Sequence, residues 1–219
     1  MATIINITNQ SEAVDAIRKH LEKTAQDTTR VLFLMPGGSA AAIAARVWQQ
    51  LSPDTKNHIT ATLTDERFGI VDHQDSNWRK LEELGANLND TPSIPVLSKE
   101  ATAQTTADAW EAKLQSAIKA CDSVVALFGI GADHHIAGIK PDSPAALESD
   151  RIVSTYQGED FERITIAPPI FEKIDCAFVY AEGKEKSSAI FDLQTERDFH
   201  EYPDELIKDC GAFVVYYKA

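Results

Sequence analysis

Apolar positions along the 219-residue chain follow two periodicities that alternate with each other. Residues 31–35 and 124–128 are continuous apolar runs, which are typical of strands buried on both faces of a sheet. Segments 11–21, 39–51 and 107–118 instead carry apolar residues at helical spacing, which predicts amphipathic helices. Strands that alternate with helices predict an α/β fold with an open, mostly parallel sheet flanked by helices, of the Rossmann-like type.

The alternation continues to the end of the chain. Further strands are predicted at residues 4–7, 59–63, 163–166, 176–180 and 213–216, and a further helix from about Lys184. Residues 141–162 show no clear periodicity. No change in composition marks a linker, and a hydrophobic fraction of 43% is sufficient for a core. We therefore expect residues 1–219 to form a single domain.

Charge and cysteine content narrow the classes of partner. The formal net charge of −13 argues against nucleic acid or an anionic membrane, although a small anionic substrate could bind in a locally positive pocket. No apolar run approaches the roughly 18 residues of a membrane span, and the first residues lack the basic region of a signal peptide. Cys121, Cys176 and Cys210 are an odd number without metal-type spacing, which favours reduced thiols in a cytoplasmic protein.

Three polar motifs each follow an apolar, strand-like run. They are residues 36–39, residues 64–67 with 75–77 after them, and residues 129–135. In an open parallel sheet, ligands bind in the crevice beyond the carboxyl ends of the strands. The three motifs together carry glycines, carboxylates, an arginine and histidines, so the sequence predicts an enzyme pocket where they meet.

The first motif, Gly37-Gly38-Ser39, places unhindered N–H groups and a hydroxyl at a predicted helix start. Such a helix end attracts phosphate, because it carries orphan donors and partial positive charge. It is not a Walker loop, since no Gly-Lys-Ser/Thr sequence follows. The simpler interpretation is a tight turn in which Ser39 caps the helix.

The third motif, Gly129 to His135, begins like a dinucleotide fingerprint, but His134 occupies the third glycine position. Its chemistry lies in Asp133 and His135. Two residues apart in a loop or extended segment, they project the same way, so the carboxylate can orient the imidazole and His135 can take a proton from water. The simpler interpretation is that Asp133 caps a following helix and His135 only packs against it.

The remaining candidates are charged or amide side chains. Arg67, in Asp65-Glu66-Arg67, could polarise an oxyanion, although such a charged run is usually a solvated loop. Asn77 follows a helix-capping turn and could face the ligand. Arg163 and Lys186 stand where an anion site would need them, but either alone could be a surface charge. No metal-binding motif and no serine nucleophile elbow is present, so we expect no metal and no cofactor.

Taken in order from Leu34 to Lys186, these motifs resemble the sugar-phosphate isomerase superfamily of 6-phosphogluconolactonases and glucosamine-6-phosphate deaminases. The resemblance implies that fold, a sugar-phosphate substrate, and a monomer or homodimer. The intact Asp-Glu-Arg and Asp-Ser-Asn runs resemble the lactonases. Deaminases typically have tyrosine at the position of Arg67 and a glutamate soon after the histidine, which is absent from residues 136–141.

The lactonase resemblance implies hydrolysis of 6-phosphoglucono-δ-lactone with His135 as general base, oriented by Asp133. Roles for the other candidate residues follow from the same resemblance: Arg67 for the developing charge, and Gly37, Gly38, Ser39, Asp65, Asn77, Arg163 and Lys186 for substrate and phosphate. Two alternatives stay open, a deaminase or isomerase that uses Asp65 as base, and a non-catalytic sugar-phosphate binder. His134 departs from the family's usual glycine, and a side chain there would narrow the pocket or strain the loop. Residues 138–140 depart from the usual Ser-Leu-Phe.

Overall fold

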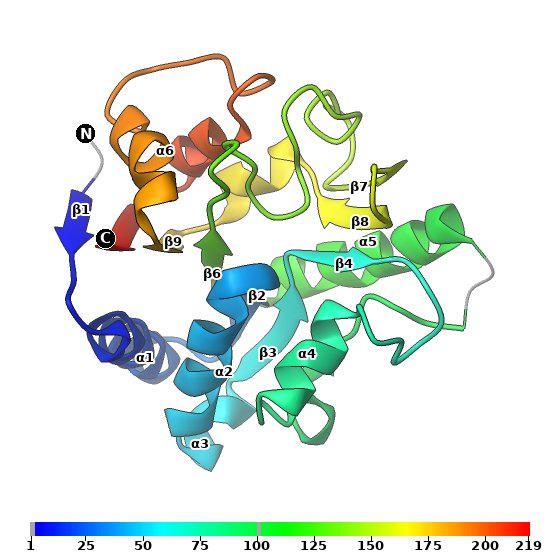
Figure 1. Ribbon diagram of the computed structural model, residues 1–219. Coiled ribbons are helices and arrows are strands. Elements are labelled where there is room, and N and C mark those ends of the chain that lie inside the picture. Colours follow the sequence, from blue (N-terminus) through cyan, green and yellow to red (C-terminus); the bar gives the residue numbers. More distant parts are fainter. Residues whose placement is uncertain (1–2, 100–101) are drawn as a thin grey trace.

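Seven parallel strands build the main sheet of this computed structural model, which describes residues 3–99 and 102–219 (Figure 1). Their order is β1-β10-β9-β6-β2-β3-β5. The bounds are β1 Thr3–Asn6, β2 Val31–Met35, β3 Ile59–Leu63, β5 Ser93–Ile94, β6 Ser123–Gly129, β9 Cys176–Glu182 and β10 Phe213–Lys218. Each neighbouring pair is parallel, so the predicted open, mostly parallel sheet is confirmed.

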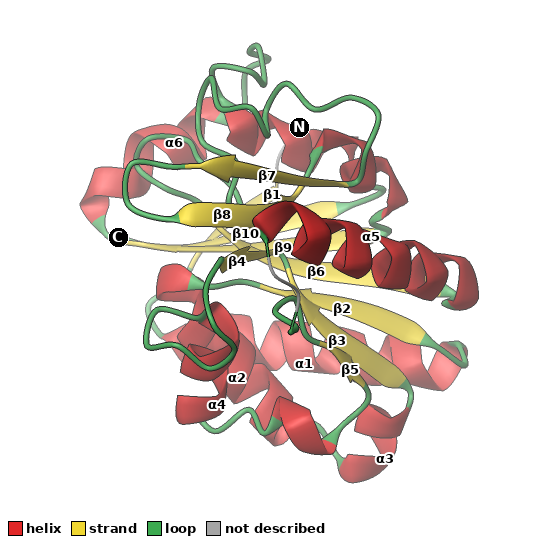
Figure 2. Cartoon of the chain, turned by 90° about the vertical axis from the view of Figure 1, so that its right-hand side faces the viewer, coloured by secondary structure: helices red, strands yellow, loops and turns green. Residues whose placement is uncertain are grey.

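Helices cover both faces of this sheet. They are α1 Gln10–Asp27, α2 Ala41–Gln50, α3 Pro53–Asn57, α4 Asn77–Glu83, α5 Ala103–Ala120 and α6 Ser187–Asp192. The connections that contain α1, α2 and α4 lead from β1 toward β5 at one edge of the sheet. The connection that contains α5 leads back from β5 to β6. Because parallel crossovers are right-handed, α5 lies on the opposite face, as Figure 2 shows. The described residues include no helix long and apolar enough to cross a membrane.

A second, antiparallel sheet lies on the α5 side and was not predicted. It contains β4 Asp65–Arg67, β8 Glu162–Ile166 and β7 Val153–Gln157, in that order. The predicted strand at 163–166 therefore belongs to this sheet and pairs with the Asp-Glu-Arg segment, where Arg67 stands opposite Arg163. The pairing brings β8, from the last third of the chain, to the carboxyl ends of β2 and β3.

One hydrophobic core joins the two sheets and the helices. All five residues of β2 are buried, as the continuous apolar run predicts. Trp48 of α2 and Trp110 of α5 are fully buried on opposite faces, and the Trp110 indole N–H donates to Thr62 Oγ1 over 3.1 Å. Burial of such large side chains contributes about 2–3 kcal/mol each and holds the strand ends rigidly beneath the site.

Candidate active site

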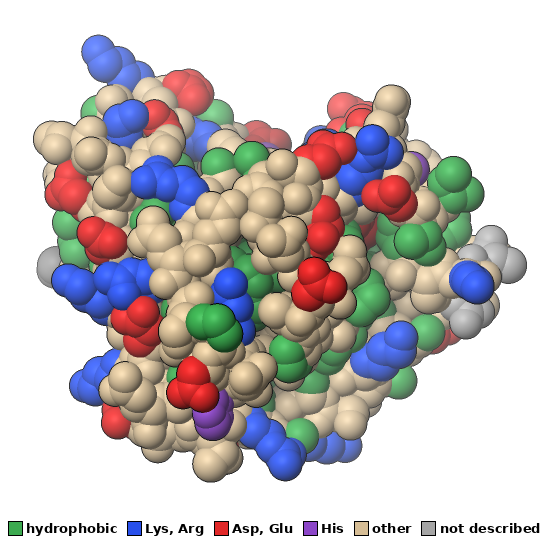
Figure 3. All heavy atoms as spheres, turned by 90° about the horizontal axis from the view of Figure 1, so that it is seen from below, with side chains coloured by type: hydrophobic (Ala, Val, Ile, Leu, Met, Phe, Trp, Pro, Cys, Tyr) green, Lys and Arg blue, Asp and Glu red, His purple; other side chains and the backbone are tan. Residues whose placement is uncertain are grey.

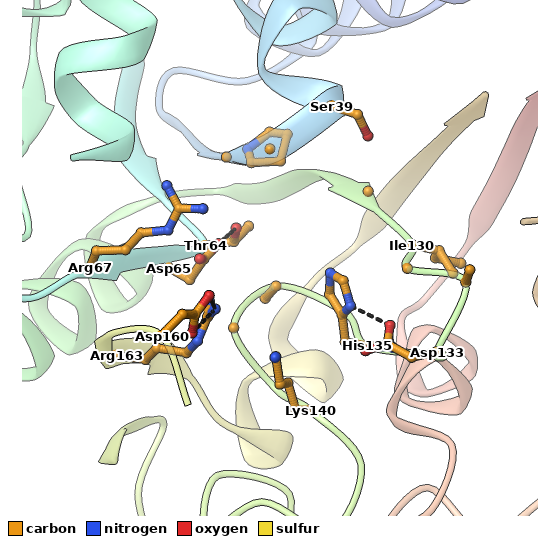
Figure 4. A pocket seen from close by; sticks show the side chains of 18 of the residues that line it. Ser39, Thr64, Asp65, Arg67, Ile130, Asp133, His135, Lys140, Asp160 and Arg163 are labelled. Carbon is orange, nitrogen blue, oxygen red and sulfur yellow. Dashed lines mark hydrogen bonds and ion pairs between the residues drawn. The ribbon is translucent and has the colours of Figure 1, made fainter. Parts of the chain in front are cut away.

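A cleft of about 430 Å³ opens at the carboxyl ends of β2, β3 and β6 (Figure 4). All three predicted motifs reach it. Of the candidate residues, the following line the cleft: Gly37, Gly38, Ser39, Asp65, Arg67, Asp133, His135, Arg163 and Lys186. Thr64, Lys140 and Asp160 line it as well and were not predicted as site residues.

The Gly-Gly-Ser turn forms one wall. Gly38 has φ +59°, a left-handed conformation that glycine adopts without strain, and a 3₁₀ turn, Gly38–Ala40, leads directly into α2. The Ser39 hydroxyl caps neither the turn nor α2, so the capping interpretation is wrong. It instead accepts a hydrogen bond from Lys186 Nζ over 3.1 Å. The wall thus presents a hydroxyl, an ammonium group and backbone N–H groups together.

Side chains of β4 alternate between the cleft and the protein interior. Asp65 and Arg67 line the cleft, whereas Glu66 is fully buried. The Glu66 carboxylate accepts hydrogen bonds from the Ser76 hydroxyl and from the backbone N–H groups of residues 67, 77 and 78. Burial raises the pKa of Glu66, and these hydrogen bonds oppose that effect. The segment is therefore a buried strand that anchors the start of α4, not a solvated loop.

Asn77 lies behind the cleft wall. It is 1% exposed, and its Nδ2 donates to Asp65 O over 2.9 Å and to Asp65 Oδ2 over 3.2 Å. The side chain also fills the space beside Gly37, where any Cβ would overlap it. Asn77 therefore does not line the cleft, and its amide holds Asp65 instead; its direct contact with the ligand stays a prediction. The predicted capping turn is present, because Ser76 accepts from Arg79 N at the start of α4.

The Asp133 and His135 side chains meet at the opposite wall, where Asp133 Oδ1 lies 2.5 Å from His135 Nδ1 (Figure 4). Partial burial acts to raise the pKa of Asp133, but the charge and hydrogen bonds of His135 outweigh it and hold this pKa below its usual value. Gly131 makes the contact possible, since a Cβ there would lie 2.1 Å from His135 Nδ1. The loop continues as turns, so Asp133 caps no helix.

His134 adopts φ +66° between these two residues, so the expected backbone strain is present. Its side chain does not line the cleft, and the expected narrowing of the pocket does not occur. The imidazole instead contacts Asp204, with 2.9 Å between Nδ1 and Oδ2. Asp133 and His135 thus line the cleft, whereas His134, between them, contacts Asp204 instead.

Positive charge gathers in the cleft despite the acidity of the whole chain. Among the described residues, four cations line it against three carboxylates: Arg67, Lys140, Arg163 and Lys186 against Asp65, Asp133 and Asp160. On the face shown in Figure 3, by contrast, acidic and basic side chains are interspersed. Burial lowers the pKa of Lys186, with Glu185 and Glu182 opposing the shift.

Arg163 and Arg67 occupy adjacent strands of the second sheet. The Arg163 guanidinium makes two 2.8 Å contacts with the Asp160 carboxylate. Burial acts to raise the pKa of Asp160, but Arg163 outweighs it and holds this pKa low. The Nε atoms of both arginines are buried and have no hydrogen-bond partner in the described part of the chain. Sequence reasoning missed Asp160 and Lys140, for which the only local signal was the i, i+3 spacing of Asp160 and Arg163.

No set of three or more His, Cys, Asp or Glu side chains in residues 3–99 and 102–219 is arranged to hold a metal ion. The arrangement can orient a histidine base beside a polar cavity and bind an anion at a nearby wall. That combination suits proton transfer on a small anionic molecule.

Comparison with known proteins places this chain in a family. A 6-phosphogluconolactonase of Synechocystis sp. is 25% identical over 209 residues, covering 90% of this chain and 84% of that protein. Another, from Nostoc sp., is 25% identical over 217 residues, covering 92% and 87%. The crystal structure of the Thermotoga maritima 6-phosphogluconolactonase superposes with a TM-score of 0.85 at 19% identity, over 100% of both chains. The family model described as glucosamine-6-phosphate isomerases/6-phosphogluconolactonase matches residues 8–215, so the chain belongs to that family.

Proposed function

We propose that this protein hydrolyses 6-phospho-D-glucono-1,5-lactone to 6-phosphogluconate. The observation that carries the proposal is the contact between Asp133 and His135 on the wall of a cleft lined by cations. A volume of about 430 Å³ suits a phosphorylated sugar lactone, because small-molecule sites typically occupy about 300–1,000 Å³. The relatives reported above carry the same activity in their names.

His135 acts as the general base. Its Nδ1–H donates to Asp133, which leaves Nε2 as the basic nitrogen. Nε2 takes a proton from water while the water oxygen attacks C1 of the lactone, and the carbonyl becomes a tetrahedral oxyanion. As this intermediate collapses, the bond between C1 and the ring oxygen breaks and the imidazolium returns the proton to that oxygen. General-base catalysis of this kind contributes about 10²–10⁴ in rate.

Arg67 stabilises the charge that develops on the oxyanion and the ring oxygen. Its guanidinium is held by a 2.9 Å hydrogen bond to Asp75 O and lies 5.4 Å from the centre of the Phe161 ring. A preorganised donor at such a position is worth about 10²–10³ in turnover. Because δ-lactones hydrolyse unaided, general-base catalysis by His135 and charge stabilisation by Arg67 are sufficient for an active enzyme. The proposed reaction therefore needs no metal ion or organic cofactor.

The phosphate group binds to Gly38, Ser39, Lys186 and Arg163. Lys186 and Ser39 are already in contact, and the Arg163 guanidinium lines the same cleft. Hydrogen bonds between cations and phosphate are among the stronger ones in proteins. Their main effect is to place C1 beside His135, which converts binding into rate.

The test is a lactonase assay on freshly generated substrate, coupled to 6-phosphogluconate dehydrogenase and corrected for spontaneous hydrolysis. Wild-type protein should exceed the background rate, and His135→Ala should abolish the excess. His200→Ala is the matched control, because His200 has the same ring contact to an aspartate, 2.7 Å to Asp198, outside the cleft. Wild-type activity equal to background refutes the proposal. Release of ammonia from glucosamine 6-phosphate would identify the deaminase instead, with Asp65 as its base.

A further inference from the structure

His134 holds a backbone conformation that glycine would adopt more easily. Its φ of +66° lies in the left-handed region, which costs a residue with a Cβ about 1–2 kcal/mol. The contact between Asp133 and His135 does not itself use the side chain of residue 134. A large side chain at this position therefore needs contacts of its own that offset the strain.

Two hydrogen bonds join residue 134 to a single partner. His134 Nδ1 lies 2.9 Å from Asp204 Oδ2, and the His134 carbonyl accepts from Asp204 N over 3.0 Å. The imidazole and the Tyr202 ring pack in a T-shaped arrangement, with 4.9 Å between ring centres. Both the ring and the backbone of residue 134 are thus fixed to the segment 202–204, some 70 residues further along the chain.

The partner segment is itself well anchored. Asp204 is 1% exposed, and burial raises its pKa to about 6 while His134 opposes the shift. His134 Nε2 also lies 3.8 Å from Asp192 Oδ2, at the end of α6, and Asp192 pairs with Arg197 over 2.7 Å. Arg197 in turn lies over the Tyr202 ring, 4.6 Å from its centre. Because Lys186 immediately precedes α6, this cluster connects the histidine loop with the element that follows Lys186.

We infer that His134 is a positioning residue, and that its contacts with Asp204 hold the loop so that His135 keeps its contact with Asp133 and faces the cleft. His134 touches no reacting atom, since its side chain does not line the cleft and contacts Asp204 instead. The expected effect of His134 on turnover rests on the proposed lactonase activity. Its expected effect on the position and hydrogen bonding of the His135 ring does not.

The test compares His134→Gly with His134→Asn. Both residues tolerate the left-handed backbone, but only asparagine retains a side-chain donor for Asp204. Displacement of a reacting group by about 1 Å can cost a hundredfold, so we expect His134→Gly to lower kcat by about tenfold to a hundredfold with little change in KM. His134→Asn should recover a large part of the loss. His200→Gly is the matched control and should leave kcat unchanged, because His200 does not line the cleft.

Nitrogen-15 NMR of the histidine rings supplies a readout independent of turnover. The His135 signals, assigned from their absence in His135→Ala, should shift in His134→Gly and stay in place in His200→Gly. If the wild type lacks lactonase activity, the proposed function fails while the NMR comparison still decides this inference. Unchanged His135 signals in His134→Gly overturn it, as does an unchanged kcat in an active enzyme. Should His134→Gly not fold, Asp204→Asn tests the same pair by the same two measurements.

Discussion

Replacing Gly131 by alanine tests whether the contact between Asp133 and His135 is needed for activity. A Cβ at residue 131 would lie 2.1 Å from His135 Nδ1 and 2.2 Å from Asp133 Oδ1, whereas ordinary contacts begin at 3.4 Å. Both side chains must therefore retreat by roughly 1 Å or more, the scale at which a misplaced catalytic group loses its effect. Gly131 has no positive φ, so alanine can adopt its backbone conformation.

The expected result is a fall in kcat of about 10²-fold, since the base loses both its position and the acceptor for its second ring nitrogen. KM should stay within about threefold, because Ser39 and Lys186 hold the phosphate from a different wall. The assay is the coupled lactonase measurement, with stability followed by thermal unfolding.

Gly129→Ala is the matched control. Gly129 borders the same cleft, but a Cβ there would meet only Ala40 Cβ, at 3.4 Å. This variant should keep kcat within about threefold of the wild type. If Gly131→Ala behaves like Gly129→Ala while His135→Ala is inactive, then His135 works without its contact to Asp133, and the reasoning is refuted.

Three further predictions concern other parts of the molecule. Lys186→Ala should raise KM for the phosphorylated lactone by about tenfold to a hundredfold, because it removes a charged hydrogen bond to the phosphate. KM for glucono-δ-lactone, which has no phosphate, should stay unchanged. An equal rise for both substrates would show that Lys186 does not bind the phosphate. Glu66→Ala should lower the free energy of unfolding in urea by about 3 kcal/mol, because buried N–H groups lose their acceptor; a loss within experimental error contradicts this. Burial raises the pKa of Cys176 to about 11, that of Cys210 to about 12 and that of Cys121 above its usual value. Because these thiols stay protonated at pH 8, they should react slowly with Ellman's reagent until the protein unfolds. Rapid labelling of the native protein would contradict that assignment.

The main sheet could be predicted because its central strands are buried on both faces and therefore read as continuous apolar runs. The second sheet could not. Residues 153–157, Val-Ser-Thr-Tyr-Gln, mix buried and exposed positions, and the pairing of β4 with β8 joins segments almost 100 residues apart. A short strand of this kind is defined by its partner rather than by its own sequence.

In the site, too, contacts between residues close in sequence could be predicted, whereas contacts between distant segments could not. The spacing of Asp133 and His135 predicted that their side chains meet, and they do, but through a turn with His134 at φ +66° rather than through extended backbone. The sequence shows only that Asn77 follows a helix-capping turn. Its contact with Asp65 joins two different elements, so no local pattern predicts that contact. Lys140 and Asp160 come from the stretch around residues 141–162, where the sequence shows no periodicity, and only the folded chain brings them to the cleft.

Two segments of the cleft wall share one arrangement. In Asp65-Glu66-Arg67 and in Asp133-His134-His135, the outer residues face the cleft and the middle one is held by the protein behind it. Glu66 binds the start of α4, and His134 binds Asp204. In both segments the middle residue supplies an anchor behind the wall, which leaves the outer side chains facing the cleft. The residue between them is the nearest side chain that can supply the anchor. Substitution of the middle residues should therefore alter the geometry of their neighbours while removing no group that touches substrate.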